Sequence, residues 1–234
     1  MIRSVKVPWR MGRSAPLVEN PRKSGRVVAV LQAREGSKRL PGKIYREVGG
    51  VTMLERAISA ARAAFLIDEV VIACPKPLER APALARAYSF PSLAEADVLG
   101  RYWACASAIP CDYILRLTAD CPMLDPHLLD AVIHYGQGAD YCSNVLTRDF
   151  PDGTDAELLS RETLRTLNYI AASPRHREHV TLMIRECQWV KDALKLVSIE
   201  TEEPQPRPKI SVDDIKDLER VNDIWQQVHA EVTA

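Results

Sequence analysis

The sequence lacks any apolar run close to the roughly 20 residues that a membrane-spanning helix needs. It also lacks an excess of charge of either sign, because 31 Lys and Arg residues balance 31 Asp and Glu residues. A chain without net charge has no overall electrostatic attraction for nucleic acid or for an anionic membrane. We therefore expect a soluble protein that binds neither a nucleic acid nor a membrane.

Paired cysteines are missing as well. The six cysteines are scattered along the chain without a Cys-x-x-Cys pair, and the five histidines have no metal-binding spacing. This pattern argues against a disulfide framework and against a zinc site. It predicts reduced thiols, mostly buried, in a cytoplasmic protein.

Residues 1–23 have few acidic residues and no continuous apolar segment, so they do not resemble a secretory signal. They are rich in Arg and Lys, and Pro8, Pro16 and Pro21 interrupt them. We interpret residues 1–23 as a basic extension, flexible or loosely docked, and residues 24–234 as one enzyme-sized domain. Nucleic-acid binding by the extension is an alternative, which its lack of interleaved aromatic residues disfavours.

The most informative stretch begins at Val27. Residues 27–31 form an apolar run typical of a buried parallel strand, and a basic segment with two glycines follows it: Arg34, Gly36, Lys38, Arg39, Gly42 and Lys43. Glycines let backbone N–H groups approach an anion and the cations neutralise it, so this segment predicts a polyphosphate site. It is not the common phosphate loop, because Ile44 follows Lys43 where that motif has Ser or Thr. A solvated Pro-Gly turn is the alternative.

Strand and helix patterns alternate along the rest of the chain. The expected strands are 67–74, 113–117, 139–144 and 194–199, the expected helices are 53–61, 78–88, 98–108, 126–135 and 161–171, and a short strand around 210–212 precedes a final amphipathic helix. A strand, a helix and a second strand at this spacing pair in parallel with a right-handed crossover. The sequence therefore predicts an α/β fold, a three-layer sandwich with a mostly parallel central sheet.

Acidic residues follow two of these strands. Asp120 comes after the strand 113–117, at the sheet edge that also carries the basic loop, so it can hold a cation against bound phosphates. An Asx turn before a proline is the alternative for Asp120. Of Asp213 and Asp214, one must cap the final helix.

The segment Gln32-Ala33-Arg34-x-Gly36-Ser37-x-Arg39-Leu40-Pro41-Gly42-Lys43 resembles the signature loop of the sugar-nucleotide cytidylyltransferases. These include the CMP-sugar-acid synthetases and the spore-coat polysaccharide biosynthesis protein F type, which this sequence resembles more. Four later stretches agree with the family in its order, so that the resemblance covers roughly residues 25–230: Asp120-Cys121-Pro122, Phe150 to Glu157, Arg177-Glu178-His179-Val180-Thr181, and Val212-Asp213.

This resemblance implies a nucleotide-diphospho-sugar transferase type of fold and assigns roles by position. Arg34 and Lys43 would contact the phosphates of CTP, and Asp120 and Asp213 would hold Mg²⁺, which leaves Asp214 as the helix cap; these four are the catalytic candidates. The implied nucleotide-binding residues are Gln32, Ala33, Arg34, Gly36, Ser37, Arg39, Lys43, Asp97 and Thr118. The implied acceptor-binding residues are Asp152, Asp155, Glu157, Arg177, Glu178 and His179.

The implied activity is the Mg²⁺-dependent transfer of CMP from CTP to a small-molecule acceptor (a sugar, sugar acid or phosphonate), with release of pyrophosphate. Residues 145–208 would form an acceptor flap or dimer arm, and a homodimer is expected, as in the family. Use of another nucleotide such as UTP and a non-catalytic nucleotide-sugar-binding protein stay open as alternatives. A Pro-Asp-Gly turn and a packing cluster are the structural alternatives for the acidic stretch 152–157 and for residues 177–179. The identity of the acceptor also stays open.

Overall fold

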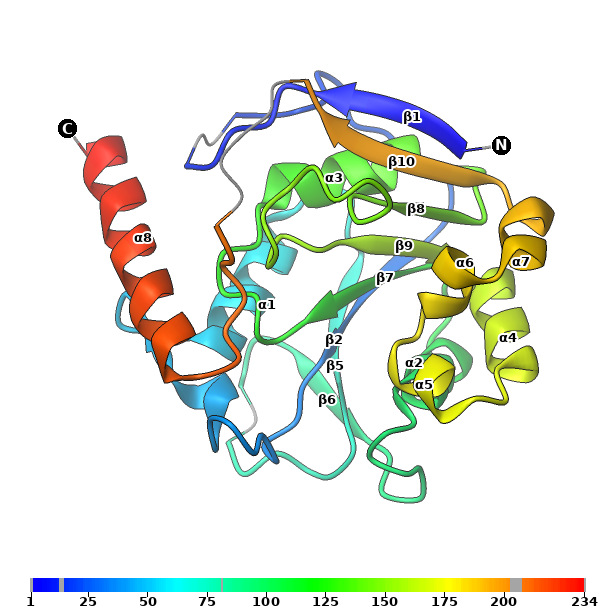
Figure 1. Ribbon diagram of the computed structural model, residues 1–234, viewed down its shortest axis with the longest axis horizontal. Coiled ribbons are helices and arrows are strands. Elements are labelled where there is room, and N and C mark those ends of the chain that lie inside the picture. Colours follow the sequence, from blue (N-terminus) through cyan, green and yellow to red (C-terminus); the bar gives the residue numbers. More distant parts are fainter. Residues whose placement is uncertain (1, 13–14, 81, 203–207, 234) are drawn as a thin grey trace.

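One eight-stranded sheet runs through the molecule in the order β1-β10-β8-β9-β7-β2-β5-β6 (Figure 1). The computed structural model describes residues 2–12, 15–80, 82–202 and 208–233. Strand β9 is antiparallel to its neighbours β7 and β8, and the other pairs are parallel. The predicted mostly parallel sheet is therefore confirmed. Its strands are β1 (Ile2–Val7), β2 (Val27–Gln32), β5 (Glu69–Cys74), β6 (Arg86–Ser89), β7 (Tyr113–Thr118), β8 (Tyr141–Ser143), β9 (Glu157–Ser160) and β10 (Leu196–Thr201).

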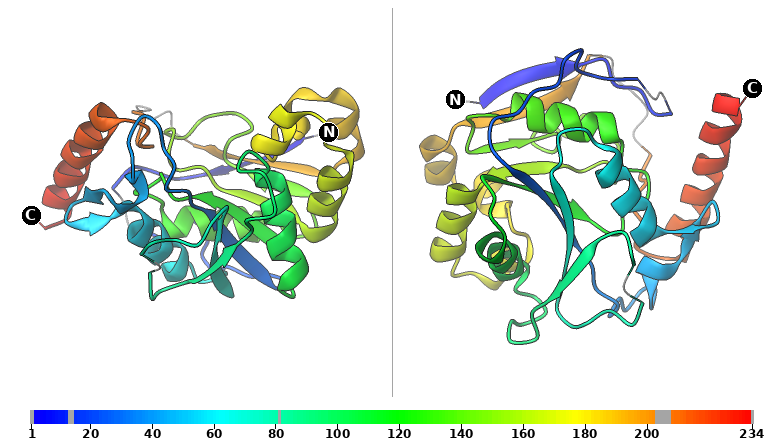
Figure 2. Two further views of the ribbon diagram at one scale, coloured as in Figure 1. Left: turned by 90° about the horizontal axis from the view of Figure 1, so that it is seen from below. Right: turned by 180° about the vertical axis from the view of Figure 1, so that it is seen from behind.

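Helices cover both faces of the sheet, which confirms the three layers (Figures 1 and 2). Successive residues of β2 point to opposite faces, so Ala29 and Leu31 join one buried core while Val28 and Val30 join the other. The first core includes α1 (Met53–Ala63) and α3 (Pro126–Tyr135). The second is covered by α2 (Val98–Ala108), α4 (Arg161–Ile170), α6 (Leu182–Glu186) and α7 (Gln188–Ala193), and α5 (Pro174–Glu178) packs beside α2.

The last helix, α8 (Ile215–Thr233), stands at one side of the molecule (Figure 1). It packs through Val221 against Val48 of a small hairpin, β3 (Glu47–Val48) and β4 (Val51–Thr52). A short 3₁₀ helix, η1 (Lys43–Tyr45), connects the basic loop to this hairpin.

Side chains cap the first turns of three of the expected helices. Thr52 accepts a hydrogen bond from the Glu55 amide at 3.2 Å, and its hydroxyl donates to the Glu55 carboxylate at 2.6 Å, which is a capping box. Asp97 caps α2 and Asp214 caps α8, each by accepting a backbone N–H bond at 3.0 Å.

The structure corrects two of the expected elements. The described residues of 78–88 form no helix: Pro82 lacks the N–H that a helix interior requires, and β6 instead pairs with the open edge of β5. Residues 210–212 form no ladder with another strand, and their amides donate to main-chain carbonyls of two loops.

The interpretation of residues 1–23 as a flexible or loosely docked extension is wrong for its first half. Strand β1 pairs in parallel with β10 over its whole length and closes one edge of the sheet. Trp9 follows, only 3% exposed, and its ring lies 5.3 Å from that of Phe150 in an edge-to-face contact. Main-chain pairing with β10, together with burial of Val7 and Trp9, therefore fixes this segment to the sheet. Residues 13–14 lie outside the described part.

All six cysteines are free thiols, as expected, and burial raises the pKa of five of them, including Cys121 beside Asp120. Within the described ranges, no helix is long and apolar enough to cross a membrane.

Candidate active site

A cleft of about 560 Å³ opens at the carboxyl ends of β2 and β7, where ligands bind in open α/β sheets. It brings together Arg34, Lys43, Asp120 and Asp213, although these come from segments far apart in the sequence. Its lining is Gln32, Arg34, Gly36, Ser37, Lys38, Arg39, Lys43, Ile44, Glu95, Ala96, Thr118, Ala119, Asp120 and Asp213.

The basic loop after β2 folds around its glycines. Gly42 has a φ of +63°, in the left-handed region that glycine adopts without steric cost, and this turn directs the chain into η1. Gly36 lies close to Glu95, since a Cβ at Gly36 would come 3.3 Å from the Glu95 carboxylate. Arg34, which is half exposed, lies 3.7 Å from the same carboxylate. The loop thus presents cations to the cleft on a closely packed backbone.

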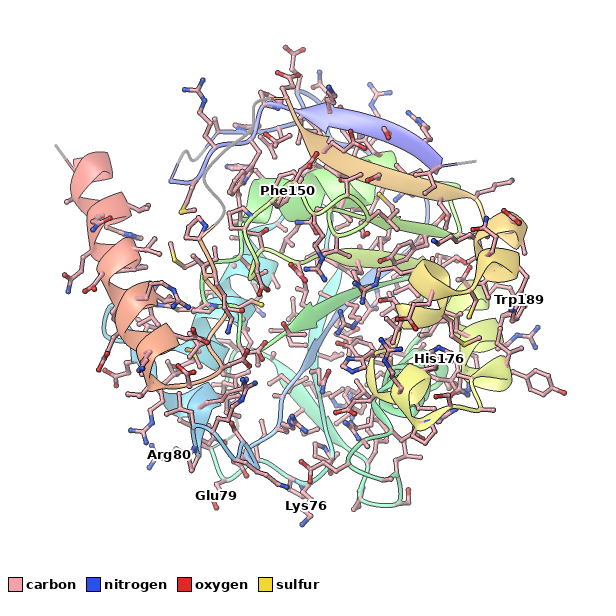
Figure 3. All side chains as sticks on the ribbon, in the orientation of Figure 1. Lys76, Glu79, Arg80, Phe150, His176 and Trp189 are labelled. Carbon is pink, nitrogen blue, oxygen red and sulfur yellow. The ribbon has the colours of Figure 1, made fainter. Side chains whose placement is uncertain are left out.

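Behind this loop, Glu35 accepts a hydrogen bond from the Tyr45 hydroxyl and another from the Glu79 amide at 2.9 Å. Burial and the bond to Glu35 raise the pKa of Tyr45 to about 12, so this phenol stays protonated. Figure 3 shows Lys76, Glu79 and Arg80 along the lower rim of the molecule, in the loop after β5. The bond from the Glu79 amide to Glu35 thus attaches the basic loop to the loop that follows β5.

Lys43 is the buried cation of the site, only 9% exposed. Its Nζ donates to Asp120 Oδ2 at 2.7 Å and to the Val212 carbonyl at 3.1 Å, and it lies 3.6 Å from Asp213 Oδ1. One ammonium therefore joins both candidate metal carboxylates.

Main-chain contacts put Asp213 opposite Asp120. The Val212 amide donates to the Asp120 carbonyl at 3.0 Å, and the Ser211 amide donates to the Asp152 carbonyl at 2.9 Å. Gly153 permits this approach, because a Cβ there would lie 2.4 Å from the Ser211 nitrogen. The Pro-Asp-Gly turn thus supports the segment that carries Asp213.

Asp213 is surrounded by cations. Arg39 reaches Asp213 Oδ1 at 2.9 Å, and Lys209 reaches Asp213 Oδ2 at 2.9 Å and Asp217 Oδ2 at 2.5 Å. Burial by itself would raise the pKa of Asp213, but the bond from Lys209 and the charge of Lys43 outweigh it and hold that pKa below its usual value. Lys209 was not predicted from the sequence, because a single lysine in an irregular segment carries no motif.

The donors present fit a hard divalent ion. Asp120 and Asp213 offer carboxylate oxygens on either side of one ammonium, and Mg²⁺ is commonly held by one or two carboxylates plus substrate phosphates. Within the described residues, no group of three or more His, Cys, Asp or Glu side chains could hold a metal. Any such ion would therefore need the phosphates as further ligands.

Asp97 and Arg177 pair with each other and do not line the cleft. The Arg177 guanidinium donates to both Asp97 oxygens, at 2.7 and 3.0 Å, and to the Asn168 side chain at 2.9 Å. Asp97 also caps α2. Both residues thus hold α2, α4 and α5 together, while Glu95 and Ala96 line the cleft just before Asp97.

Among the other acceptor candidates, Asp155 lies within electrostatic reach of Asp152 and Glu157. Glu157 is only 2% exposed, accepting from Arg116 at 3.0 Å and from Thr181 at 2.9 Å. Asp155 pairs with Arg148 at 3.3 Å, and burial raises its pKa. The remaining candidates, Asp152, Glu178 and His179, are exposed. The structure therefore brings Asp152 and Asp155 within electrostatic reach of Cys121, the neighbour of Asp120.

Comparison with known proteins agrees with this geometry. A family model described as Cytidylyltransferase matches residues 28–231. The spore coat polysaccharide biosynthesis protein SpsF of Bacillus subtilis (strain 168) is 30% identical over 216 residues, which are 86% of this chain and 87% of that protein.

Solved structures share the fold. A cytidylyltransferase from Leptospira borgpetersenii serovar Hardjo-bovis (strain JB197) superposes with a TM-score of 0.75 at 24% identity, over 89% of this chain and 94% of that chain. CMP:2-keto-3-deoxy-manno-octonic acid synthetase, solved with CTP, gives 0.63 at 16% identity, over 86% and 99%. A Mycobacterium tuberculosis H37Rv protein solved with manganese gives 0.60 at 13%, over 85% and 98%. Because the family model matches most of its residues, the chain belongs to the cytidylyltransferase family, a family of nucleotidyltransferases.

Proposed function

We propose that the protein transfers CMP from CTP to a sugar, sugar acid or phosphonate acceptor, with Mg²⁺ and with release of pyrophosphate. One observation supports this most: the basic loop with Arg34 and Lys43 shares a cleft with Asp120 and Asp213. Cations and closely packed backbone suit a triphosphate, and carboxylate oxygens suit a hard divalent ion. Family membership and the CTP-bound structural neighbour support CTP as the nucleotide.

In such a transfer, an acceptor oxygen attacks the α-phosphorus and pyrophosphate leaves on the opposite side. The protein contributes mainly positioning and charge neutralisation. Arg34 and Arg39 are exposed cations on the cleft loop and would bind the phosphates that leave. Gln32 and Thr118, at the ends of β2 and β7, would contact the rest of the nucleotide.

Asp120 and Asp213 would hold the divalent ion. When bound, Mg²⁺ supplies charge neutralisation at the phosphates and lowers the pKa of a nearby acceptor hydroxyl, so the reaction needs no dedicated protein base. The structural neighbour that was solved with manganese supports a divalent ion in this fold.

The acceptor would approach from the side of residues 145–208, of which 203–207 lie outside the described part. Figure 3 places His176 on this side and Trp189 at its outer surface. The resemblance to the Bacillus protein supports a role in polysaccharide biosynthesis. We extend the proposal to a cytoplasmic homodimer.

The experiment is a measurement of pyrophosphate release from each of the four nucleoside triphosphates, with and without Mg²⁺, across a panel of sugars, sugar acids and phosphonates. We expect release from CTP only, dependent on Mg²⁺ and on one class of acceptor. Asp120→Asn should lower kcat by about 100-fold or more, while Asp223→Asn, on the exposed side of α8, should leave it unchanged. Release from UTP would reassign the nucleotide. Tight binding of nucleotide sugars without release from any triphosphate would support a non-catalytic protein instead.

A further inference from the structure

The ammonium of Lys43, a candidate phosphate-binding group, is bound by other groups of the protein itself. Its ammonium donates to Asp120 at 2.7 Å and to the Val212 carbonyl at 3.1 Å, with Asp213 at 3.6 Å. Its side chain is only 11% exposed. Two hydrogen bonds and one ion pair therefore engage this ammonium within the protein itself.

The position of this ammonium coincides with the donors expected to bind a metal. Asp120 Oδ2 and Asp213 Oδ1 both face Lys43 Nζ, so the ammonium lies next to both carboxylates that would hold a divalent ion. Like charges at such separations repel strongly where water is largely excluded. The ammonium and the ion therefore compete for these oxygens.

The charges around the two carboxylates also disfavour binding of a divalent ion without nucleotide. Arg39 contacts Asp213 in addition to Lys43, while Lys209 is shared between Asp213 and Asp217. The charges of both candidate metal carboxylates are thus already neutralised by cations of the protein before a divalent ion arrives. A nucleoside triphosphate brings the further negative charge that favours binding of the ion.

We propose that Lys43 is the resident cation of the candidate metal site. It holds Asp120 and Asp213 together before substrate binds, and a divalent ion has to displace its ammonium from their oxygens. The ion consequently enters together with the triphosphate and not ahead of it. Lys43 is in this respect a positioning residue of the ligand-free protein, and the inference rests on the metal site of the proposed function.

The test measures Mn²⁺ binding to the purified full-length protein without nucleotide, by equilibrium dialysis. We compare wild type with Lys43→Met, which removes the ammonium and keeps an unbranched side chain of similar length. The matched control is Lys38→Met, because Lys38 is an exposed lysine of the same cleft. Lys43→Met should bind Mn²⁺ at least about tenfold more tightly than wild type, and Lys38→Met within about twofold of it.

A second measurement separates this role from general support of the fold. Without Lys43, two neighbouring carboxylates lose their shared partner, so the Tm of Lys43→Met should be lower than that of wild type. Mn²⁺ should then restore the Tm of this variant, and it should shift the Tm of wild type much less. If Lys43→Met does not fold without Mn²⁺, Lys43→Gln replaces it in both measurements. The double variant Asp120→Asn, Lys43→Met should lose the gain in Mn²⁺ affinity.

The inference is overturned if neither Lys43 variant binds Mn²⁺ more tightly than wild type. Should wild type still release pyrophosphate from CTP with Mn²⁺ in that case, the proposed function stands and only the role of Lys43 is wrong. If wild type neither binds Mn²⁺ with CTP present nor releases pyrophosphate, the metal site fails and the inference fails with it.

Discussion

The Val212 amide donates a hydrogen bond to the Asp120 carbonyl at 3.0 Å, and Asp213 is the next residue along the chain. This single bond joins the two segments that supply the candidate metal carboxylates. The Asp152 carbonyl holds the same segment from the other side, accepting from the Ile210 amide at 2.6 Å. The spacing of the carboxylates therefore depends on backbone contacts, some of them with the 152–153 turn, which supplies no candidate metal ligand.

We expect Gly153→Ala to disturb the site from a distance. Gly153 has a φ of +116°, and a Cβ there would meet the Ser211 nitrogen at 2.4 Å, so the segment before Asp213 must move. The free energy of unfolding should fall by roughly 2 kcal/mol or more, and kcat should fall with it. Urea unfolding and pyrophosphate release measure the two effects.

Gly138→Ala is the matched control for this change. Its φ of +73° imposes a similar conformational cost, but no atom lies within 4 Å of the added Cβ. It should cost about 1 kcal/mol and leave kcat unchanged. An equal loss of kcat in both variants would contradict the proposed role of the 152–153 turn.

Lys209→Met should weaken the use of the metal. Lys209 bridges Asp213 and Asp217, and without it the Asp213 carboxylate loses a contact that fixes its orientation. Loss of a residue that orients a ligand typically costs 10- to 100-fold in metal affinity or activity, so we expect about a tenfold higher Mg²⁺ requirement in the pyrophosphate assay. Lys216→Met, at an exposed position of α8, should behave as wild type. A lower kcat at an unchanged Mg²⁺ requirement would argue against this role.

Trp9→Phe should destabilise the protein although it keeps an aromatic ring. The Trp9 indole donates to Asp125 Oδ2 at 2.8 Å, and burial raises the pKa of this aspartate, which also caps α3. Leaving that buried oxygen without its donor should cost about 1–3 kcal/mol of unfolding free energy. Trp189→Phe is the control, because Trp189 is 61% exposed on α7. Equal stability of the two variants would show that the N-terminal segment is not fixed as described.

Asp68→Asn should lower stability in a pH-dependent way. Burial would raise the pKa of Asp68, but the bonds from Lys23 and from the Val27 amide lower it overall. A carboxyl whose pKa is lowered by folding stabilises the protein above its unfolded pKa of about 3.9, and this contribution disappears as the pH falls through the folded pKa. The difference from wild type should thus be about 1 kcal/mol at pH 7 and vanish in strong acid.

Urea unfolding at a series of pH values measures this difference. Asp223→Asn, an exposed carboxylate on α8, is the matched control and should follow wild type throughout. If the difference between Asp68→Asn and wild type is the same at every pH, the charge of Asp68 does not stabilise the first residue of β2.

The sequence by itself determined the layered fold and the position of the basic loop. Alternating apolar runs and helix caps such as Thr52 and Asp97 involve residues that are close in the chain. The strands and helices that they specify can therefore be predicted from the sequence. The carboxyl ends of parallel strands share one edge, which is why Asp120 could be expected beside the loop after β2.

Only the tertiary structure determined which residues the charged side chains pair with. The pairing of Asp97 with Arg177 and the burial of Glu157 against Arg116 join segments that chain spacing does not relate. The same holds for β1, whose short and weakly apolar strand is stable only because β10 offers an open edge. Such contacts depend on which surfaces remain exposed after the core has packed, and the local sequence pattern does not contain that information.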